Sequence, residues 1–86
     1  MTHQASRADV ASQVRSVIMG LRPDLRPEQI AEDETLAGLG IDSVDRIEIL
    51  LTIAAQYRLE DRVSRLGAHS NVGALIDYLK TVTTHR

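Results

Sequence analysis

The chain contains no cysteine, no phenylalanine and no tryptophan. Without cysteine, a disulfide framework, a thiolate zinc site and a cysteine nucleophile are all excluded. The aromatic residues are the two tyrosines Tyr57 and Tyr78, which predicts an aliphatic core. No apolar run approaches the ~18 residues of a membrane span, and residues 1–8 lack the apolar stretch of a signal peptide. We therefore expect a cytoplasmic protein without a membrane span.

The length of 86 residues corresponds to one small domain. We expect a single domain over residues 1–86, with frayed ends at residues 1–5 and 83–86. Apolar residues recur at helical spacing in several segments, and no segment shows the sustained alternation of a strand. This pattern predicts an all-α bundle of three main helices and one short helix, with a long loop between the first two helices.

The expected elements are a helix at 6–20, a loop at 22–41, a second helix at 42–57, a short element at 59–67 and a last helix capped by Ser70. Ser6 begins a capping box and Asp42 is the expected N-cap of the second helix. The long loop suggests either a helical turn within it or a functional role. Ile30, Leu36 and Leu39 are its expected anchors in the core.

The helix expected at 42–57 has two apolar rows, where a surface helix usually has one apolar face. One row holds Ile49, Ile53 and Tyr57, joined by Leu50, and the other holds Val44, Ile47, Leu51 and Ala54. Two rows indicate either deep burial by plain interhelical packing, or one face for the core and another for a partner or ligand.

The formal net charge of −2 is unevenly distributed along the chain. Residues 28–48 contain seven acidic residues and one basic residue, Arg46, and so carry a net charge of −6. The segments 1–27 and 49–86 each carry +2. A strongly acidic middle segment argues against nucleic acid as its partner and favours a basic protein surface.

The titratable and nucleophilic side chains form no catalytic set in the sequence. His3, His69 and His85 include no pair at the i, i+4 spacing of a metal site, so we expect solvated or capping histidines and no bound metal. The chain has no nucleophile elbow, no phosphate-binding P-loop and no dinucleotide fingerprint. We therefore expect that it is not an enzyme.

One stretch stands out because a glycine-containing loop leads to Ser43 in the first turn of a helix. Unpaired backbone N–H groups and the positive end of the helix dipole stabilise an anion at such a place. From the residue types alone, Asp42 or Ser43 is more often merely a helix cap. The wider pattern is Leu39-Gly40-x-Asp42-Ser43-Val44-x-x-x-Glu48, which resembles the phosphopantetheine attachment motif of acyl carrier proteins.

The resemblance extends over nearly the whole chain, in helix order and in length. It implies that a phosphopantetheinyl transferase attaches 4'-phosphopantetheine, taken from coenzyme A, to Ser43, with Asp42 as the acidic neighbour engaged in the reaction. The thiol of the arm then carries acyl groups as thioesters, so the protein is expected to be a non-catalytic, monomeric carrier. Its other expected partners are acyl-loading and acyl-processing enzymes with basic docking surfaces. The residues expected to contact partners are Val44, Asp45, Ile47, Glu48 and Leu51.

Two departures from the family pattern favour a dedicated carrier of a specialised pathway, in polyketide or other secondary metabolism or in a related fatty-acid-like pathway. Many fatty-acid carriers have glutamates where Ala54, Ala55 and Gln56 precede Tyr57 here. An aliphatic anchor is common where Ala68, His69 and Ser70 stand. We expect either that Leu66 or Val63 replaces this anchor or that the short third helix is mobile.

Two alternatives remain open at this point. The chain could be a peptidyl, aryl or D-alanyl carrier that an adenylating enzyme loads, although Gly40-Ile41-Asp42 before the serine favours acyl cargo. It could instead be a small helical adaptor without a prosthetic group. An adaptor would use Ser43 as a cap and the row of Val44, Ile47 and Leu51 as a docking face.

Overall fold

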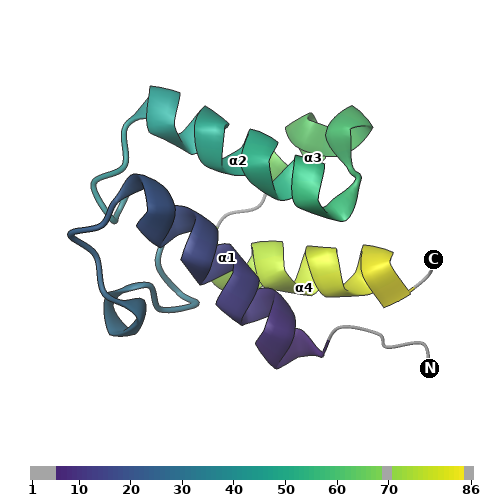
Figure 1. Cartoon of the computed structure of the whole chain (residues 1–86), viewed down its shortest axis with the longest axis horizontal. Coiled ribbons are helices and arrows are strands. Elements are labelled where there is room, and N and C mark those ends of the chain that lie inside the picture. The colour runs from purple at the N-terminus through teal and green to yellow at the C-terminus, as the bar shows by residue number, and fades with distance from the viewer. Residues whose placement is uncertain (1–5, 69–70, 85–86) are drawn as a thin grey trace.

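A computed structural model describes residues 6–68 and 71–84 of the chain (Figure 1). Its elements are α1 (Arg7–Leu21), η1 (Pro27–Gln29), α2 (Ser43–Tyr57), η2 (Glu60–Arg62), α3 (Val63–Gly67) and α4 (Val72–Thr84), where η marks a 3₁₀ turn. No strand occurs in the described ranges, so the all-α class with three main helices and one short helix is confirmed. No helix in these ranges is both long and apolar enough to cross a membrane.

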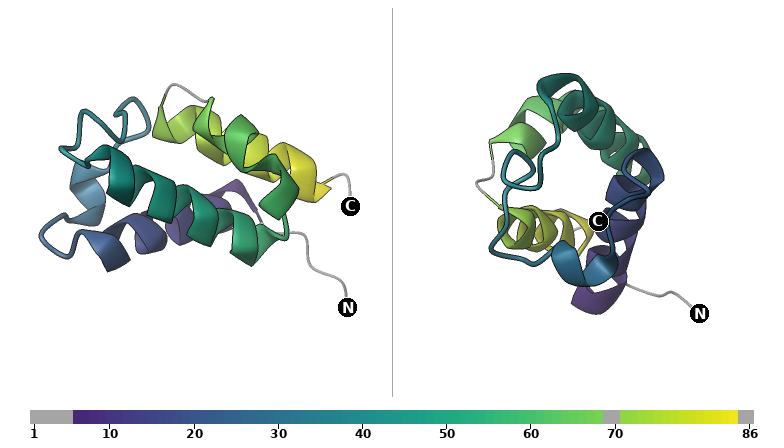
Figure 2. Two further views of the ribbon diagram at one scale, coloured as in Figure 1. Left: turned by 90° about the horizontal axis from the view of Figure 1, so that it is seen from above. Right: turned by 90° about the vertical axis from the view of Figure 1, so that its left-hand side faces the viewer.

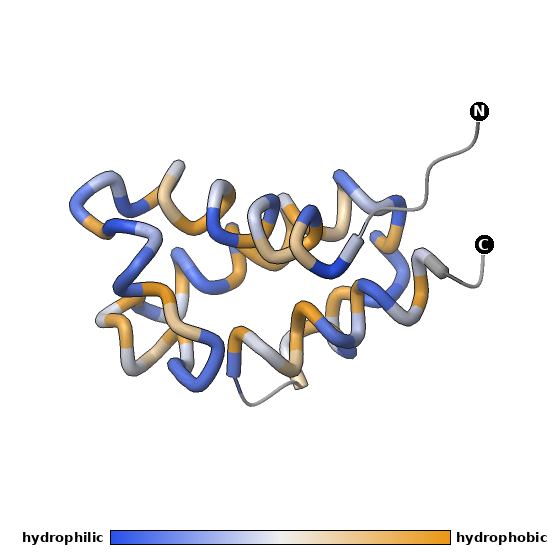
Figure 3. Tube along the Cα trace, turned by 90° about the horizontal axis from the view of Figure 1, so that it is seen from below, coloured by the Kyte–Doolittle hydropathy of each residue, from blue (hydrophilic) through white to orange (hydrophobic). Residues whose placement is uncertain are grey.

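Helix α1 lies against both α2 and α4, and α3 packs on α2. Seen from the end of the molecule, the helices surround a common interior, and the loop between α1 and α2 crosses one end of it (Figure 2). Hydrophobic and hydrophilic residues alternate along each helix with a short period, as expected for helices that bury one face (Figure 3).

The buried core is aliphatic, as the sequence predicts, and none of its described members is polar or charged. It consists of Val10, Ala11, Val14, Val17, Ile18, Ile30, Ile41, Ile49, Ile53, Ala54, Leu59, Leu66, Val72, Leu75, Ile76 and Leu79. Tyr57 and Tyr78 pack at its margin and are partly buried. Leu66 supplies the anchor expected before the last helix, with Val63 partly buried beside it.

The two ends of α1 follow directly from the sequence. The hydroxyl oxygen of Ser6 accepts a hydrogen bond from the backbone N–H of Asp9 at 3.1 Å, and the Asp9 carboxylate accepts one from the N–H of Ser6 at 3.2 Å. This is the predicted capping box. The helix continues through Gly20 to Leu21, one residue beyond the expected end.

The loop between α1 and α2 contains the helical turn that its length suggested, at η1. Ile30 is fully buried, and Leu36 and Leu39 pack against the core, so the three expected anchors are confirmed. Ile41 is a fourth anchor, 2% exposed, that the sequence did not predict. The buried side chains of Ile30 and Ile41 therefore fix the second half of the loop at its two ends.

The loop is also joined to α1 and α4 by hydrogen bonds. The backbone oxygens of Glu32 and Glu34 accept from the N–H groups of Gly73 and Val72 at 2.8 and 2.9 Å. The Arg7 guanidinium donates to the carboxylates of Glu32, at 2.6 and 2.7 Å, and of Asp77, at 2.7 Å. The bonds from Arg7 lower the pKa of the Glu32 carboxyl. Because Arg7 and Glu32 are only partly buried and Asp77 is exposed, solvent weakens these ion pairs, and the network positions the loop more than it stabilises the fold.

The last helix begins at Val72 and ends at Thr84. Asn71 caps it, because Asn71 Oδ1 accepts from the N–H of Ala74 at 2.8 Å; the expected cap, Ser70, lies outside the described residues. At its other end α4 continues to Thr84, within the residues 83–86 that were expected to fray, and Thr83 Oγ1 donates to the Leu79 oxygen at 2.9 Å. That bond satisfies the threonine hydroxyl within the helix.

Several expectations fall on parts of the chain that the structure does not describe. These are Ser70 itself, the expected frayed ends at 1–5 and 85–86, and the solvated or capping roles of His3, His69 and His85.

The two apolar rows of α2 have different environments. Ile49 and Ile53 are fully buried, whereas Val44, Ile47 and Leu51 are 71%, 57% and 49% exposed. Plain interhelical packing therefore does not explain the second row. The exception is its last predicted member: Ala54 is fully buried and belongs to the core.

We predict a large difference in stability between two matched substitutions in α2. Ile53→Ala should lower the free energy of unfolding by about 2–5 kcal/mol, because it leaves a cavity in the core. Ile47→Ala removes the same atoms from an exposed position and should change it by about 0.5 kcal/mol at most. Urea denaturation followed by circular dichroism measures both values. Similar losses for the two variants would show that the assignment of the two faces of α2 is wrong.

Candidate functional site

The segment before Ser43 is shaped by a series of tight backbone turns. The N–H groups of Leu39, Gly40 and Ile41 donate to the oxygens of Thr35, Ala37 and Leu36 at 3.0, 3.0 and 3.2 Å. Gly40 has a φ of 81°, in the left-handed region that strongly favours glycine. The chain thus reaches the start of α2 in one defined conformation.

Arg22, at the end of α1, ties this turn to the rest of the molecule. One guanidinium nitrogen donates to the backbone oxygen of Gly40 at 2.9 Å, and two others donate to the Asp24 carboxylate at 2.9 Å. The Asp24 carboxylate, followed by the charges of Asp45 and Asp42, raises the pKa of Arg22. The same bond lowers the pKa of Asp24. Arg22 therefore lies in the electrostatic field of the acidic residues at the start of α2.

Asp42 is the cap of α2, and Ser43 is the first residue of the helix. Asp42 Oδ1 accepts from the N–H of Asp45 at 2.8 Å, and its backbone oxygen accepts from the N–H of Arg46 at 2.9 Å. Of the two capping possibilities that the sequence left open, the structure shows Asp42. Ser43 is exposed, and its hydroxyl takes part in no hydrogen bond within the described ranges.

The position of Ser43 favours a bound anion. The first N–H groups of a helix have no partner within that helix, and the helix dipole adds positive potential there. A phosphate group attached to the side chain at this position would be close to both. The hydroxyl is also accessible to a second protein, because Ser43 is exposed.

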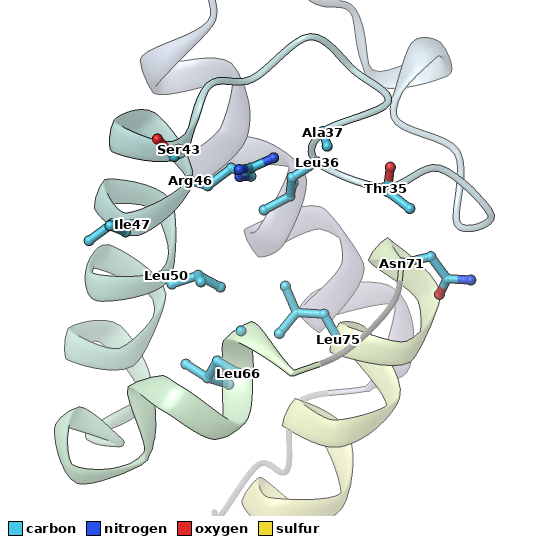
Figure 4. A pocket seen from close by; sticks show the side chains of 11 residues that line it. Thr35, Leu36, Ala37, Ser43, Arg46, Ile47, Leu50, Leu66, Asn71 and Leu75 are labelled. Atoms are coloured by element: carbon cyan, nitrogen blue, oxygen red, sulfur yellow. The ribbon is translucent and has the colours of Figure 1, made fainter.

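An apolar cavity of about 410 Å³ opens beside Ser43. Its walls include Leu36 from the loop, Leu50 from α2, Leu66 from α3 and Leu75 from α4, and their side chains point into one space (Figure 4). A cavity of this size and apolar lining is typical of sites for small ligands. Neither the cavity nor the place of Arg46 in its wall follows from the sequence, because the lining comes from four separate segments.

The structure brings most of the expected partner-binding residues to one exposed surface of α2. Val44, Ile47, Glu48 and Leu51 are all exposed, and their spacing places them on one side of the helix; we call them the exposed α2 face. Asp45 is partly buried and interacts electrostatically with Arg22.

Comparison with known families gives a match to this chain. A family model described as phosphopantetheine attachment site matches residues 17–79, which is most of the chain. The chain belongs to this phosphopantetheine attachment family. The chain matches no curated protein and no solved structure.

Members of this family are carrier domains, and their cofactor is a covalent 4'-phosphopantetheine. The residues at the start of α2 fit such a group. An exposed hydroxyl is available at Ser43, the helix terminus accommodates the phosphate, and an apolar cavity adjoins both. The fold expected from the resemblance is confirmed as well, since the matched residues include all of α2 and α3 and the loop before them.

We predict that Asp42 and Ser43 contribute unequally to stability. Asp42→Ala removes the cap of α2 and should lower the free energy of unfolding by about 0.5–2 kcal/mol. Ser43→Ala removes an exposed hydroxyl without a partner and should change it by about 0.5 kcal/mol at most. Thermal and urea denaturation of the two variants measure these values. An equal or larger loss in Ser43→Ala would contradict the assignment of the cap.

Proposed function

We propose that this chain is an acyl carrier protein whose 4'-phosphopantetheine arm is attached to Ser43. One observation carries the proposal: Ser43 is an exposed first residue of α2, beside an apolar cavity, within the segment that matches the family. The family membership argues against the alternative of an adaptor without a prosthetic group.

The attachment step needs one group from this chain, the Ser43 hydroxyl. Its oxygen forms a new P–O bond to the pantetheine phosphate of coenzyme A, and the bond from that phosphorus to adenosine 3',5'-bisphosphate breaks. The hydroxyl proton passes to the transferase. Asp42 holds the first turn of α2 in place through its bond to Asp45, so that the backbone of Ser43 stays in a fixed position. The bound arm supplies the thiol on which an acyl group is held as a thioester.

The cavity supports acyl cargo over an aminoacyl group. Leu36, Leu50, Leu66 and Leu75 line it, and an apolar chain gains free energy when it leaves water for such a surface. A peptidyl or aryl carrier is the second candidate, and identification of the cargo on the purified protein would separate the two.

The exposed α2 face supports docking of partner enzymes. It has an apolar row with Glu48 within it, and Asp42 and Asp45 lie near its N-terminal end. Protein interfaces commonly combine an apolar centre with charged residues around it. The complementary surface would be apolar in the middle and basic around the position of Ser43.

A specialised pathway is supported by the composition of the second half of α2. Ala55 and Gln56 are exposed and uncharged, and Ala54 is buried in the core. The acidic surface therefore ends at Glu48, so a partner that requires acidic residues along the whole helix would find few of them here. We propose polyketide or other secondary metabolism, with a related fatty-acid-like pathway as the alternative.

We predict a single modification at Ser43. Incubation with coenzyme A, magnesium and a broad-specificity phosphopantetheinyl transferase should increase the intact mass by one phosphopantetheine group. Ser43→Ala should show no increase, whereas Ser16→Ala, which alters an exposed serine of α1, should be modified like the original chain. No mass increase in the folded original chain, or an increase in folded Ser43→Ala, would refute the proposal.

We also predict that charge reversal on the exposed α2 face weakens recognition. Glu48→Lys should lower kcat/KM of the transferase by about tenfold, the low end of electrostatic steering effects. The free energy of unfolding should change by about 0.5 kcal/mol at most, because Glu48 is exposed. Glu28→Lys makes the same change of net charge in η1 and serves as the control. Equal effects of the two variants would indicate that the docking surface lies elsewhere.

A further inference from the structure

Arg46 is the basic residue within the acidic segment 28–48, and it lies one helical turn after Ser43. Its side chain is partly buried and forms part of the wall of the cavity. In Figure 4 the guanidinium extends from α2 toward Leu36 and Ala37, across the end of the cavity nearest Ser43. A positive charge in this segment weakens the attraction of basic partners. A local role for Arg46 would explain its presence there.

The guanidinium of Arg46 has no ion pair or hydrogen bond within residues 6–68 and 71–84. Other arginines of the fold differ: Arg7 and Arg22 form ion pairs, and Arg15 donates to the backbone oxygen of Ile30 at 2.9 Å. The carboxylate of Asp42, which lies four residues before Arg46, accepts from the N–H of Asp45 and does not pair with the Arg46 guanidinium. A guanidinium with five donors and no acceptor, on a side chain that is partly buried, is suited to an anion that arrives later.

The spacing of Ser43 and Arg46 matches an anion attached to the serine. Residues at i and i+3 on a helix are neighbours, with about 5–6 Å between their Cβ atoms. An arginine side chain spans that distance, and its planar guanidinium pairs with two phosphate oxygens at once. The N–H groups at the start of α2 would stabilise the same phosphate.

We infer that Arg46 binds the phosphodiester that joins the arm to Ser43 and so holds the first part of the arm over the cavity. This inference rests on the proposed function, because it requires an arm at Ser43. Arg46 is a positioning residue: it directs the arm toward Leu36 and Leu50 and away from the exposed α2 face. It also offsets the repulsion between the phosphate and the neighbouring carboxylates of Asp42 and Asp45.

The test compares the unmodified and the phosphopantetheine-bearing forms of four chains: the original chain, Arg46→Gln, Arg46→Lys and Arg62→Gln. Arg62 is an exposed arginine of η2, beyond the opposite end of α2, and so provides a matched control. Intact mass first establishes that each chain carries the arm. The readouts are the ³¹P resonance of the phosphodiester and the ¹⁵N–¹H signal of Arg46 Nε, both recorded without acyl cargo.

We expect attachment of the arm to shift the Nε signal of Arg46 in the original chain. The ³¹P resonance should shift in Arg46→Gln relative to the original chain, remain closer to it in Arg46→Lys, and be unchanged in Arg62→Gln. At about 1 M NaCl, where the Debye length is about 3 Å, the resonance of the original chain should approach that of Arg46→Gln.

The possible failures can be distinguished from one another. A folded original chain that gains no mass refutes the proposed function and this inference with it. A chain that carries the arm but shows the same ³¹P resonance in Arg46→Gln, and no change at Arg46 Nε, refutes this inference alone. If the Nε signal shifts only after loading with a carboxylate-bearing acyl group such as malonyl, Arg46 binds cargo and the assignment to the phosphodiester is wrong.

Discussion

The burial of Ile41 is the constraint on which the site depends. Ile41 lies two residues before Ser43 and is 2% exposed, so the core holds the chain where the loop turns into α2. The positive φ of Gly40 on one side and the cap at Asp42 on the other are consequences of bringing that side chain inward and then starting a helix at once. As a result, the backbone of Ser43 has a defined position at the wall of the apolar cavity.

A second constraint is that α2 buries one apolar face in the core and exposes another apolar face to solvent. Ile49 and Ile53 bury one side of the helix, and this fixes its rotation about its own axis. Once that rotation is set, Val44 faces outward and Leu50 turns into the cavity, while Ile47 is exposed and also lines the cavity. The burial of Ile49 and Ile53 therefore determines which side chains of α2 line the cavity and which are exposed.

The sequence predicted the features that depend on local spacing. The capping box at Ser6 and the Asp42 cap each depend on residues three apart, and the helices depend on apolar periodicity. Ile41 was missed because it lies outside any periodic run. The Asn71 cap was missed because Ser70 and Asn71 are adjacent and both are good capping residues, so local spacing does not distinguish them.

The cavity could not be predicted because its walls come from four segments that are brought together only by the fold. Arg46 was visible in the sequence as an isolated charge, but its orientation toward the cavity depends on the rotation of α2. The chemical character of the site was nonetheless accessible, because the attachment motif is continuous in sequence. What the structure adds is the relation between Ser43, the cavity and the exposed α2 face.

The acidic segment acquires a more limited role once its contacts are known. Glu32 pairs with Arg7, and the carboxylate of Asp42 caps α2, so part of the −6 charge serves the fold itself. Glu48 remains exposed beside Val44 and Ile47. Charges at the edge of an interface chiefly change the rate of association, whereas buried apolar contacts contribute most of the affinity. The acidic residues would therefore bring basic partners to α2, and the apolar row would determine which of them remain bound.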